Sequence, residues 1–421
     1  MKLAVVVQRY GLAIHGGTEL HARYIAEHLA QHADVEVLTT CASDDRTWAN
    51  EYKAGVETIN GVRVRRFRVS RSRKAAASVQ LADIVFHQTH SLGDELNWIE
   101  AEGPVSRSLL RHLRKHGNAY DFCLFFDYRY CHSFRGAHAV PSRAILVPRA
   151  EHDEAIGAQV FRGVFRGARA ILYNSPEERS LIQAVTANTQ VPGVVVGAGA
   201  DVPPNPQPGR FRQKHNIRGG FAIHIGRIDE RHGCAELFDL FQQYCSQPSS
   251  KLSLVLVGDG PLAVPTHPKI KHVGVLDEAG KFDALAAAEV LLVPSRYESL
   301  SRTALEAWAL ARPVLANAKS DVLKGQCLRS NGGLCYRNAE EFIAMLQAFE
   351  QNRWLSGSLG KSGRQYFRDH YDWRVIERKY HDMLAQLQKA APRETIEPLP
   401  GWSERRRRNV PPAADVVRSA S

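Results

Sequence analysis

Two glutamates, Glu298 and Glu306, stand in the part of the sequence whose residue types and spacing best suit chemistry. The apolar residues that end at Val293 predict a buried strand, and the residues from about Ser301 onward predict a helix. Glu298 would lie in the loop at the carboxyl end of the strand, and Glu306 would lie in the helix. Carboxylates accept hydrogen bonds from hydroxyl groups, and the amides at a helix N-terminus bind phosphates. The segment therefore favours a ligand that carries both kinds of group, such as an activated sugar.

Each glutamate also has an interpretation that needs no ligand. Thr303 and Glu306 have the Thr-x-x-Glu spacing of a capping box, in which two side chains cap the first turn of a helix. For Glu298 the alternative is a solvated carboxylate in a loop. Ser299 and Leu300 directly precede the predicted helix, so their amides are candidates for the contact with an anion.

A second group of candidate residues follows the strand predicted over Phe221–Ile225. Gly226 allows close approach of the backbone, and the planar guanidinium of Arg227 suits phosphate oxygens. Arg231 and His232 complete the group before the next predicted helix. The alternative for Arg227 is a surface ion pair with a neighbouring carboxylate.

Two glycines, Gly16 and Gly17, link the first predicted strand to the first predicted helix. Glycines at this point let a diphosphate approach the backbone at the helix N-terminus. On their own they are weak evidence, because many parallel-sheet proteins have glycines there.

The elements that must position these residues form two series in which apolar strands alternate with helices. The helical patterns include Glu19–Ala30, Cys234–Cys245 and Thr303–Ala311. Because strands alternate with helices, we expect parallel sheets that are covered on both faces. The predicted strands are Leu3–Val7, Val35–Thr39, Val62–Val69, Phe122–Phe126, Ala144–Val147 and Ala170–Tyr173, followed by Phe221–Ile225, Leu252–Val257, Val290–Val293 and Val314–Ala316.

The two series predict two doubly wound α/β domains that face each other across a cleft. Residues 199–209 are rich in proline and glycine and separate the series as a linker. We place the first domain at residues 1–200 and the second at residues 210–390. Residues 391–421 lose the apolar periodicity and predict a disordered basic tail.

The composition excludes several classes of protein. No run approaches the ~18 apolar residues that predict a membrane span. The seven cysteines form no C-x-x-C pair, so neither a disulfide framework nor a zinc site is indicated, and we expect a cytoplasmic protein. The sequence also contains no Asp-x-Asp motif, so we expect no essential metal.

The net charge of +11 is concentrated in places, which favours anionic partners such as acidic lipid headgroups or phosphorylated substrates. We therefore expect residues 63–74 to face either the membrane surface or an anionic substrate, which would be the acceptor if the protein transfers a sugar. The alternative is a solvated basic surface. Nucleic acid is not expected, because no aromatic-rich RNA-binding motif or zinc-finger spacing accompanies the charge. The clusters comprise Arg63, Arg65, Arg66, Arg68, Arg71, Arg73 and Lys74, and near the C-terminus Arg405 to Arg408.

Taken together, these motifs resemble glycosyltransferase family 4, whose members are retaining enzymes with the two-domain GT-B architecture. The resemblance covers the chain up to about residue 390, and it rests on several motifs in the order that the family has. Ser299 and Leu300 stand where the family usually has a glycine and an aromatic residue. The matching segments are Gly16-Gly17-x-Glu19, Gly226-Arg227 with Gly233, Gly258-Asp259-Gly260-Pro261, Pro294-Ser295 and the Glu-x7-Glu signature from Glu298 to Glu306.

The resemblance implies a role for each matching residue. Glu306 would bind the ribose hydroxyls of a nucleotide-sugar donor, and Glu298 would contact the transferred sugar near the reacting carbon. The amides of Ser299 and Leu300 would approach the sugar and the diphosphate. Arg227 would neutralise the leaving group, and Gly17 would supply an amide from the opposite domain.

Two positions are less certain within the resemblance. The family often has a functional histidine in a loop of the first domain, for which the candidates are His152 and His132. We favour His152, which lies among acidic residues; the alternative is a surface histidine. At His232 the family usually has a lysine, which is a permanent cation, whereas histidine titrates near neutral pH. Either Arg231 takes over, or His232 acts as an imidazolium, or catalysis is impaired.

The expected function is transfer of a sugar, with retention of configuration, from a nucleotide-diphosphate sugar to an unidentified acceptor. The acceptor would be a glycan or a lipid-linked molecule, and the lipid-linked case would bring the protein to the inner membrane face. No cofactor is expected beyond the donor itself. The alternatives are a nucleotide-sugar epimerase or a phosphorylase on the same fold, and a degenerate, non-catalytic relative.

Overall fold

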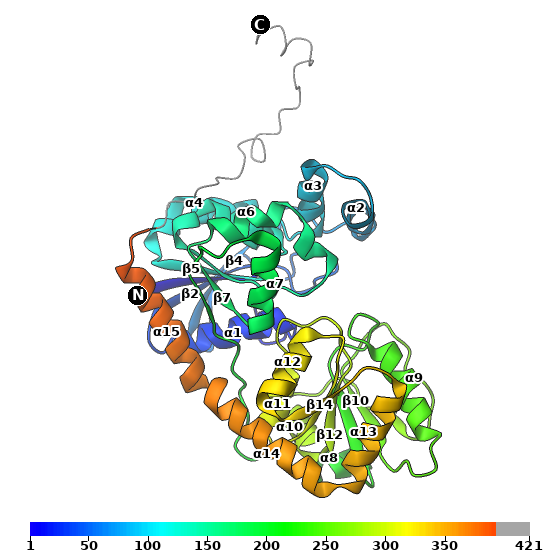
Figure 1. Ribbon diagram of the computed structural model, residues 1–421. Coiled ribbons are helices and arrows are strands. Elements are labelled where there is room, and N and C mark those ends of the chain that lie inside the picture. Colours follow the sequence, from blue (N-terminus) through cyan, green and yellow to red (C-terminus); the bar gives the residue numbers. More distant parts are fainter. Residues whose placement is uncertain (393–421) are drawn as a thin grey trace, which may run out of the picture.

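The computed structural model describes residues 1–392, which form two sheets with helices on both faces of each (Figure 1). The parallel α/β architecture expected from the sequence is confirmed. The basic tail predicted from residue 391, including Arg405 to Arg408, lies outside the described residues apart from its first two positions.

The first sheet has eight strands in the order β3-β4-β2-β1-β5-β6-β7-β8. All neighbours run parallel except β3 and β4, which form an antiparallel pair at the edge. The strands are β1 Lys2–Val6, β2 Asp34–Thr40, β3 Gly55–Ile59, β4 Val62–Phe67, β5 Phe122–Phe126, β6 Ala144–Val147, β7 Ala170–Tyr173 and β8 Gly193–Val195.

The second sheet has six parallel strands in the order β11-β10-β9-β12-β13-β14. Counted along the chain, this is the 3-2-1-4-5-6 order of a doubly wound nucleotide-binding sheet. The strands are β9 Phe221–Ile225, β10 Ser253–Val257, β11 Ile270–His272, β12 Val290–Val293, β13 Val314–Asn317 and β14 Gly333–Tyr336.

Helices cover these sheets because the central strands are apolar on both faces. All residues of β5, β6, β7, β12 and β13 are buried, as expected for parallel strands between two helical layers. The helices are α1 Gly17–Leu29, α2 Ala75–His87, α3 Leu92–Glu102, α4 Arg107–His116, α5 Cys131–Ala139, α6 Val160–Gly167, α7 Pro176–Thr186, α8 Pro208–Lys214, α9 Cys234–Cys245, α10 Glu278–Ala287, α11 Arg302–Ala309, α12 Asp321–Ser330, α13 Ala339–Gln351, α14 Arg353–His370 and α15 Trp373–Lys389.

Every strand predicted from the sequence is present, but four short strands were not predicted: β3, β8, β11 and β14. They lie at or next to the edges of the two sheets, where one side of the strand has no neighbour. Four of the five residues of β3 are exposed, and none of the three residues of β8 is buried. Such strands lack the continuous apolar run that marks a central parallel strand.

Both sheets reverse their strand order at one point, between β1 and β5 in the first sheet and between β9 and β12 in the second. Ligands of open parallel sheets bind outside the carboxyl ends of the strands at such a reversal. The loops that leave β1, β5, β9 and β12 therefore define the place where a site is expected.

The last helix, α15, returns to the first sheet after α14 has packed on the second (Figure 1). Arg169 donates a hydrogen bond of 2.9 Å to the carbonyl of Leu387, and the Lys379 ammonium donates to the carbonyl of Val196 at 3.2 Å. Residues 373–389, which we had assigned to the second domain, thus contact the first.

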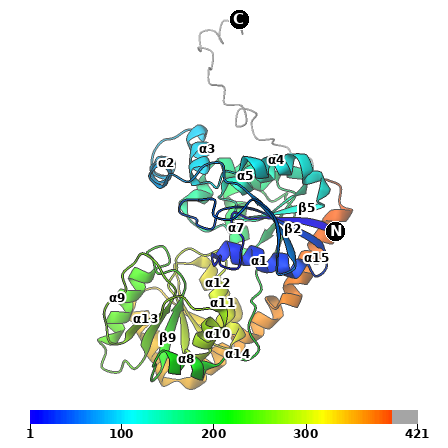
Figure 2. The ribbon, with the colours of Figure 1, turned by 180° about the vertical axis from the view of Figure 1, so that it is seen from behind.

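The two halves also meet directly through α1 and α7. Figure 2 shows α1 lying between the two sheets. The guanidinium of Arg302, at the start of α11, lies 5.3 Å from the ring centre of Tyr24 on α1. Arg329 on α12 forms an ion pair with Glu177 on α7, with one of its bonds at 3.0 Å.

No helix among residues 1–392 is long and apolar enough to cross a membrane. All seven cysteines are free thiols, and five of them are buried.

Candidate functional site

Glycines bring the loops at the carboxyl ends of β9, β10 and β12 into close contact. A Cβ atom at Gly258 would overlap the carbonyl oxygen of Gly226, and one at Gly233 would overlap the carbonyl oxygen of Pro294. Gly233 also has a φ of +77°, which favours glycine. The requirement for glycine at these positions is therefore explained by close packing of backbone, and this packing sets Arg227 and His232 beside the loop that holds Glu298.

The capping-box interpretation, which was the alternative for Glu306, is wrong. Helix α11 begins at Arg302 with Ser301 as its N-cap, and no side chain caps it. Thr303 is then the second residue of the helix, so the Thr-x-x-Glu spacing falls inside the helix. The carboxylate of Glu306 forms ion pairs instead with the ammonium of Lys281 at 2.9 Å and with the guanidinium of Arg302 at 3.6 Å.

Glu306 is buried, with 3% of its side chain exposed, and only one of its oxygens is used. Oε1 accepts the contacts from Lys281 and Arg302, whereas Oε2 has no hydrogen-bond partner within the described residues. A buried acceptor without a donor costs about 1–3 kcal/mol. A ligand hydroxyl that donates to Oε2 would remove this cost.

Glu298 lies in the loop after β12 and is half-buried. Burial, and after it the charge of Glu151, raises the pKa of its carboxyl to about 8, although the charge of Arg149 opposes the shift. Glu151 and Arg149 belong to the loop after β6 of the first sheet. Glu298 is therefore close enough to the first half for two of its charges to act on it.

The backbone between the two glutamates is buried and only partly hydrogen-bonded. Ser299, Leu300 and Ser301 expose 1%, 6% and 2% of their surfaces. The amide of Ser301 donates to Oε1 of Gln326 at 3.2 Å. Within residues 1–392, the amides of Ser299 and Leu300 have no acceptor. They point to an anion-accepting position at the N-terminus of α11.

The loop after β9 arranges its cations around one carboxylate. Asp229 contacts Arg227 at 3.1 Å through Oδ2 and the His232 ring at 2.7 Å through Oδ1. Oδ1 also accepts a bond of 2.8 Å from the His232 amide. The ion pair that was the alternative for Arg227 is thus present, but 45% of its side chain is exposed, so the guanidinium is open to a second anion.

Arg231 reaches from the second half to the first. One of its terminal nitrogens contacts Oε2 of Glu151 at 2.5 Å and Oδ2 of Asp153 at 2.9 Å. Its guanidinium also lies 4.9 Å from the ring centre of Tyr297. The cation that the resemblance assigned to a diphosphate is therefore held by two carboxylates of the facing loop.

On the first sheet, the two glycines meet a residue that the sequence analysis did not single out. A Cβ atom at Gly17 would lie 2.8 Å from a terminal nitrogen of Arg149, and one at Gly16 would overlap the carboxylate of Glu19. The same nitrogen of Arg149 donates to the hydroxyl of Thr18 at 3.0 Å. Gly16 and Gly17 thus let the start of α1 lie against the guanidinium of Arg149.

Asp127, which follows β5, was also not predicted. Its Oδ2 accepts a bond of 3.2 Å from the hydroxyl of Thr18, and burial raises the pKa of its carboxyl to about 6. Asp127 and Arg149 have φ angles of +65° and +54°, which are uncommon for residues other than glycine. Such strain is found most often at functional sites. The only sequence signal for these two residues is their position directly after a buried strand.

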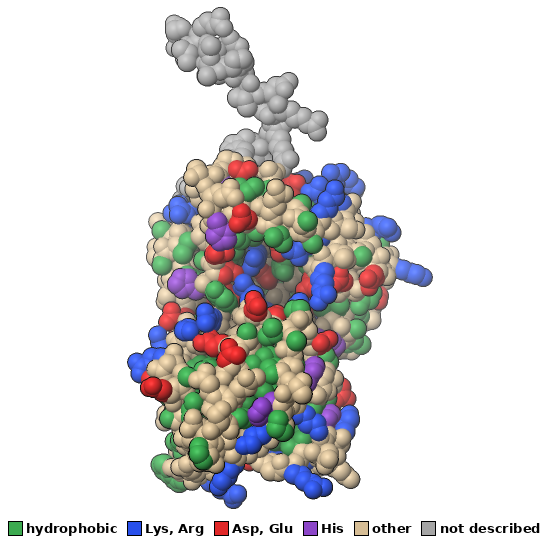
Figure 3. Space-filling model, turned by 90° about the vertical axis from the view of Figure 1, so that its right-hand side faces the viewer, with side chains coloured by type: hydrophobic (Ala, Val, Ile, Leu, Met, Phe, Trp, Pro, Cys, Tyr) green, Lys and Arg blue, Asp and Glu red, His purple; other side chains and the backbone are tan. Residues whose placement is uncertain are grey.

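These groups surround a polar cavity of about 150 Å³ between the two halves. Figure 3 shows a hollow at the junction of the halves with basic and acidic side chains within it. The cavity receives side chains from the carboxyl ends of β5 and β6 and from the loop after β9. Its lining consists of Thr18, Asp127, Tyr128, Arg129, Tyr130, Arg149, Glu151, Asp153 and Arg231.

The two candidate histidines differ in their surroundings. His132 is buried, and its Nε2 forms a hydrogen bond of 3.2 Å with the carbonyl of Phe126. Burial lowers the pKa of its ring to about 3. It is a core histidine. His152 is exposed and stands between Glu151 and Asp153, the two carboxylates that hold Arg231.

A buried glutamate on α7 holds the loop that carries Arg149. Oε1 of Glu178 accepts a bond of 2.6 Å from the amide of Ala150, and Oε2 accepts one of 2.5 Å from the amide of Asn174. The hydroxyl of the N-cap Ser175 accepts a bond from the Glu178 amide at 3.1 Å. Burial raises the pKa of the Glu178 carboxyl to about 8.

We expect Glu178→Ala to lower the free energy of unfolding by about 2 kcal/mol, because two buried amides lose their acceptor. The substitution also frees Ala150, so any activity that depends on Arg149 should fall. Urea denaturation measures the first effect. Glu177→Ala is the matched control on the same turn, since a partly exposed ion pair contributes at most about 1 kcal/mol. Equal losses in the two variants would contradict a positioning role for Glu178.

The second sheet matches a known protein family. Residues 221–352 fit the family model described as glycosyl transferases group 1. These residues form a glycosyltransferase domain. The glycosyltransferase domain contains Glu298, Glu306, Arg227 and His232. The match does not extend to the first sheet.

Solved structures share the fold of nearly the whole chain. Sucrose-phosphate synthase from Thermosynechococcus elongatus has 17% identity and a TM-score of 0.67, with 93% of this chain and all of the other covered. HepE from Anabaena in complex with UDP-glucose has 14% identity and a TM-score of 0.66, with 92% of this chain and all of the other covered. The structure described as trehalose-6-phosphate from E. coli bound with UDP-2-fluoro glucose has 11% identity and a TM-score of 0.67, with 93% of this chain and all of the other covered. At these identities the likeness establishes the GT-B architecture alone. No curated protein matches the chain significantly.

Proposed function

We propose that the protein is a retaining glycosyltransferase of family 4 that transfers a sugar from a nucleotide-diphosphate sugar. The observation that carries this proposal is the unpartnered oxygen of Glu306, buried at the strand-order reversal of a glycosyltransferase domain. A nucleotide ribose supplies two neighbouring hydroxyl donors, which fits a single buried carboxylate oxygen.

The roles proposed for the other groups follow from their positions around the Glu306 carboxylate. The free amides of Ser299 and Leu300 would receive a phosphate at the N-terminus of α11. Glu298 would hold the transferred sugar, since the charges of Glu151 and Arg149 in the first half act on it. Arg227, with almost half of its side chain exposed, would neutralise the diphosphate from the open side.

Arg231 would exchange partners during the reaction. It is held by Glu151 and Asp153, and a diphosphate that enters the cavity would compete with both carboxylates for it. His232 is bonded to Asp229 and would add charge to the same place. We propose that this pair replaces the lysine usual in the family, with Gly17 of the first half supplying an amide to the donor.

Transfer would use groups from both halves. The bond between the anomeric carbon and the diphosphate oxygen breaks, and the acceptor oxygen bonds to the same face of that carbon. The acceptor proton passes to the departing diphosphate. We propose His152 as a catalytic residue of the first half, near the acceptor. The acceptor itself would be a glycan or a lipid-linked molecule. Closure of the halves would exclude water.

A thermal-shift series with nucleotide sugars tests the donor assignment. Because UDP-glucose and UDP-2-fluoro glucose occupy two structures of this architecture, we expect UDP-sugars to raise the midpoint most. At a concentration about 100 times Kd, a ligand adds about 2.7 kcal/mol to the free energy of unfolding. Free glucose and uridine are the controls, and the absence of any nucleotide effect would contradict the proposal. Product analysis separates the alternatives, because an epimerase changes the donor without an acceptor and a phosphorylase requires phosphate.

A further inference from the structure

The basic segment 63–74 is not one charged face, because carboxylates neutralise much of it. Arg63 and Arg65 both contact Glu36, at 3.2 and 2.9 Å. Arg66 forms an ion pair with Glu57, and Arg73 forms one of 2.5 Å with Glu102. These four arginines therefore contribute little free charge to the surface.

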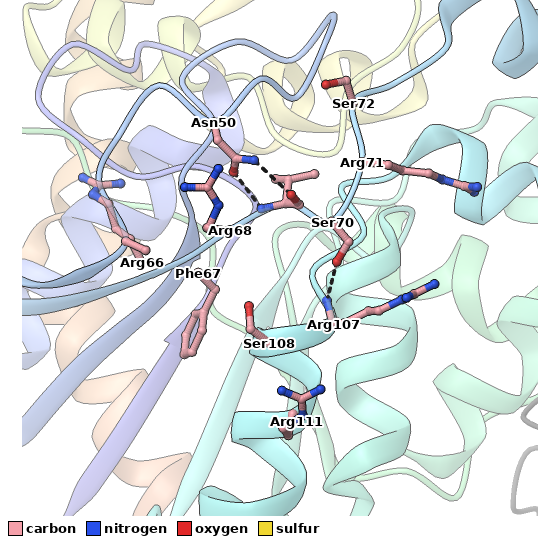
Figure 4. A pocket seen from close by; sticks show the side chains of 12 residues that line it. Asn50, Arg66, Phe67, Arg68, Ser70, Arg71, Ser72, Arg107, Ser108 and Arg111 are labelled. Carbon is pink, nitrogen blue, oxygen red and sulfur yellow. Dashed lines mark hydrogen bonds between the residues drawn. The ribbon is translucent and has the colours of Figure 1, made fainter.

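The remaining arginines gather with others from α4 around a cavity of about 730 Å³ (Figure 4). Arg68 comes from the segment after β4, whereas Arg107 and Arg111 lie one turn apart on α4. The hydroxyls of Ser70 and Ser108 share the lining, and no carboxylate is part of it.

The walls of this Arg68–Arg111 pocket are held in place by hydrogen bonds to backbone. The Asn50 amide accepts a bond of 2.7 Å from the amide of Val69 and donates one of 2.9 Å to its carbonyl. The amide of Arg107 donates to the Ser70 hydroxyl at 3.1 Å, and the Ser106 hydroxyl donates to the Arg68 carbonyl at 2.8 Å. The pocket is therefore formed before any ligand enters, which lowers the entropic cost of binding.

The positive charge of the pocket is only partly compensated, because Arg66 pairs with Glu57 and Arg71 lies 3.8 Å from Glu100. Among residues 1–392, no carboxylate lies within 4.0 Å of the guanidinium groups of Arg68, Arg107 or Arg111. A fourth lining residue, Arg66, has 3% of its side chain exposed, and its Nη1 has no hydrogen-bond partner. Three free cations and hydroxyl donors suit a doubly charged phosphate better than a single carboxylate.

The pocket lies at the carboxyl end of β4, on the face of the first sheet that α4 covers. Strands β4, β2 and β1 run parallel, so the chain after β4 emerges at the same edge as Gly16 and Gly17 after β1. Arg9 connects the two places. It contacts Glu19 at 2.7 Å and Asp45 at 3.5 Å, and it lies 5.9 Å from the ring of Trp48.

Trp48 lines a second cavity, of about 360 Å³, which shares Arg71 and Ser72 with the Arg68–Arg111 pocket. The contacts of Arg9 and the shared lining of the two cavities thus link the start of α1 to the basic pocket. A molecule that lies along this edge would have one end in the pocket and the other near the cleft.

We propose that the Arg68–Arg111 pocket binds a phosphate group of the acceptor. This inference rests on the proposed function, because it assigns the chemistry of the acceptor for that transfer. The concave shape and the hydroxyl donors favour a discrete phosphate within the pocket over a flat bilayer surface. The phosphate belongs either to a phosphorylated sugar or to a lipid phosphate. In the first case a sugar, and in the second a lipid chain, would lie along the sheet edge between the pocket and the cleft.

The test compares the double variant Arg68→Gln/Arg111→Gln with Arg179→Gln, an exposed helical arginine of the same half outside the pocket. Titrations with glucose 6-phosphate and with farnesyl phosphate are made in saturating UDP, so that phosphate sites of the donor domain are filled. Glucose and farnesol are the uncharged controls. We expect at least one phosphate to bind saturably, with affinity at least about tenfold lower in the double variant, since each lost charged hydrogen bond contributes about 1.5–3 kcal/mol. Arg179→Gln should bind as the wild type does.

Other results would overturn the proposal. Binding of neither phosphate, or equal binding by the wild type and the double variant, would remove the pocket as a phosphate site. Binding only to phosphatidylcholine vesicles that contain phosphatidylserine, with loss in the double variant, would assign the arginines to the membrane surface. UDP titrations separate this failure from failure of the donor site: unchanged UDP affinity in the double variant leaves the proposed function standing.

Discussion

Replacing Glu306 by alanine is expected to abolish binding of the nucleotide sugar and to lower the free energy of unfolding by about 3–5 kcal/mol. The second effect follows from what the carboxylate touches. Lys281 and Arg302 have 13% and 15% of their side chains exposed, and both contact Oε1 of Glu306. Removing one member of a buried ion cluster leaves the other charges without compensation in a medium of low polarity.

The loss of binding and the loss of stability are separable by a second substitution. In Glu306→Ala/Lys281→Ala the uncompensated ammonium is gone, so a large part of the stability should return. Binding of the nucleotide sugar should remain absent, because the acceptor for the ribose hydroxyls is still missing. Urea denaturation and titration with UDP-glucose on the same protein samples measure the two quantities.

Glu341→Ala is the control for removal of a carboxylate from an ion pair elsewhere. Glu341 pairs with the exposed Arg337 one turn away on the surface, where solvent screens the pair so that it contributes little to stability. Its stability and UDP-glucose affinity should match those of the wild type. If Glu306→Ala/Lys281→Ala regains both stability and binding, then Glu306 is a structural partner of Lys281, and the donor assignment is wrong.

The case of Glu306 shows which part of the site the sequence predicts well. The strand that ends at Val293 and the helix after it were both expected, because an apolar run followed by a helical pattern is a local feature. The capping-box interpretation was wrong because the N-cap is Ser301, two residues before Thr303. Helix ends inferred from patterns are uncertain by one or two residues, and a cap depends on the exact first residue.

Of the two ion partners of Glu306, Arg302 stands four residues before it on the same helix, whereas Lys281 had no sequence signal. Lys281 lies on α10, 25 residues away along the chain, and it meets Glu306 only because the two helices pack. The same holds for the first half of the site, where Arg149 meets Thr18 across 131 residues. Charge partners of this kind depend on the tertiary fold, which a local pattern does not contain.

The sequence alone also did not show which charges of the basic segment are neutralised, for the same reason. Arg63, Arg65, Arg66 and Arg73 carry charge in the sequence, but their acidic partners come from β2, β3 and α3. The arginines that complete the pocket, on α4, stand more than 30 residues after the segment. The strand order brings them together, whereas a count of charge along the chain does not.

Glu298→Gln is expected to make the unfolding free energy less dependent on pH while it removes sugar transfer. The folded protein holds the Glu298 carboxyl at a pKa of about 8, mainly through burial and then through the charge of Glu151. An unfolded glutamate loses its proton near pH 4.5. Between these values the folded state binds more protons than the unfolded state, so this group makes the folded state less stable as the pH rises.

The variant lacks this titration, so the difference in unfolding free energy between Glu298→Gln and the wild type should grow in favour of the variant from about pH 5 to pH 8. The slope is at most about 1.4 kcal/mol per pH unit, and it should vanish above pH 8. The carboxyls of Asp127 and Glu178, whose pKa values are also raised, are present in both proteins and cancel in the difference. Urea denaturation at several pH values provides the measurement.

Glu230→Gln is the matched control, because Glu230 is an exposed glutamate of the neighbouring loop. If the difference from the wild type has the same pH dependence for Glu298→Gln as for Glu230→Gln, then the Glu298 carboxyl is not held in a protonated form, and the buried environment assigned to it is wrong.

Activity adds a second, independent readout for Glu298. If Glu298 holds the transferred sugar and Glu306 holds the ribose, then Glu298→Gln should keep its affinity for UDP and lose transfer by about 100-fold to 1000-fold, as when one polar contact to the reacting group is removed. Loss of UDP affinity together with transfer would place Glu298 at the nucleotide instead. The pH dependence of unfolding concerns the free protein, whereas UDP affinity concerns the complex. The expected pH dependence can therefore be observed even if UDP affinity is lost. Only both expected results together assign Glu298 to the sugar.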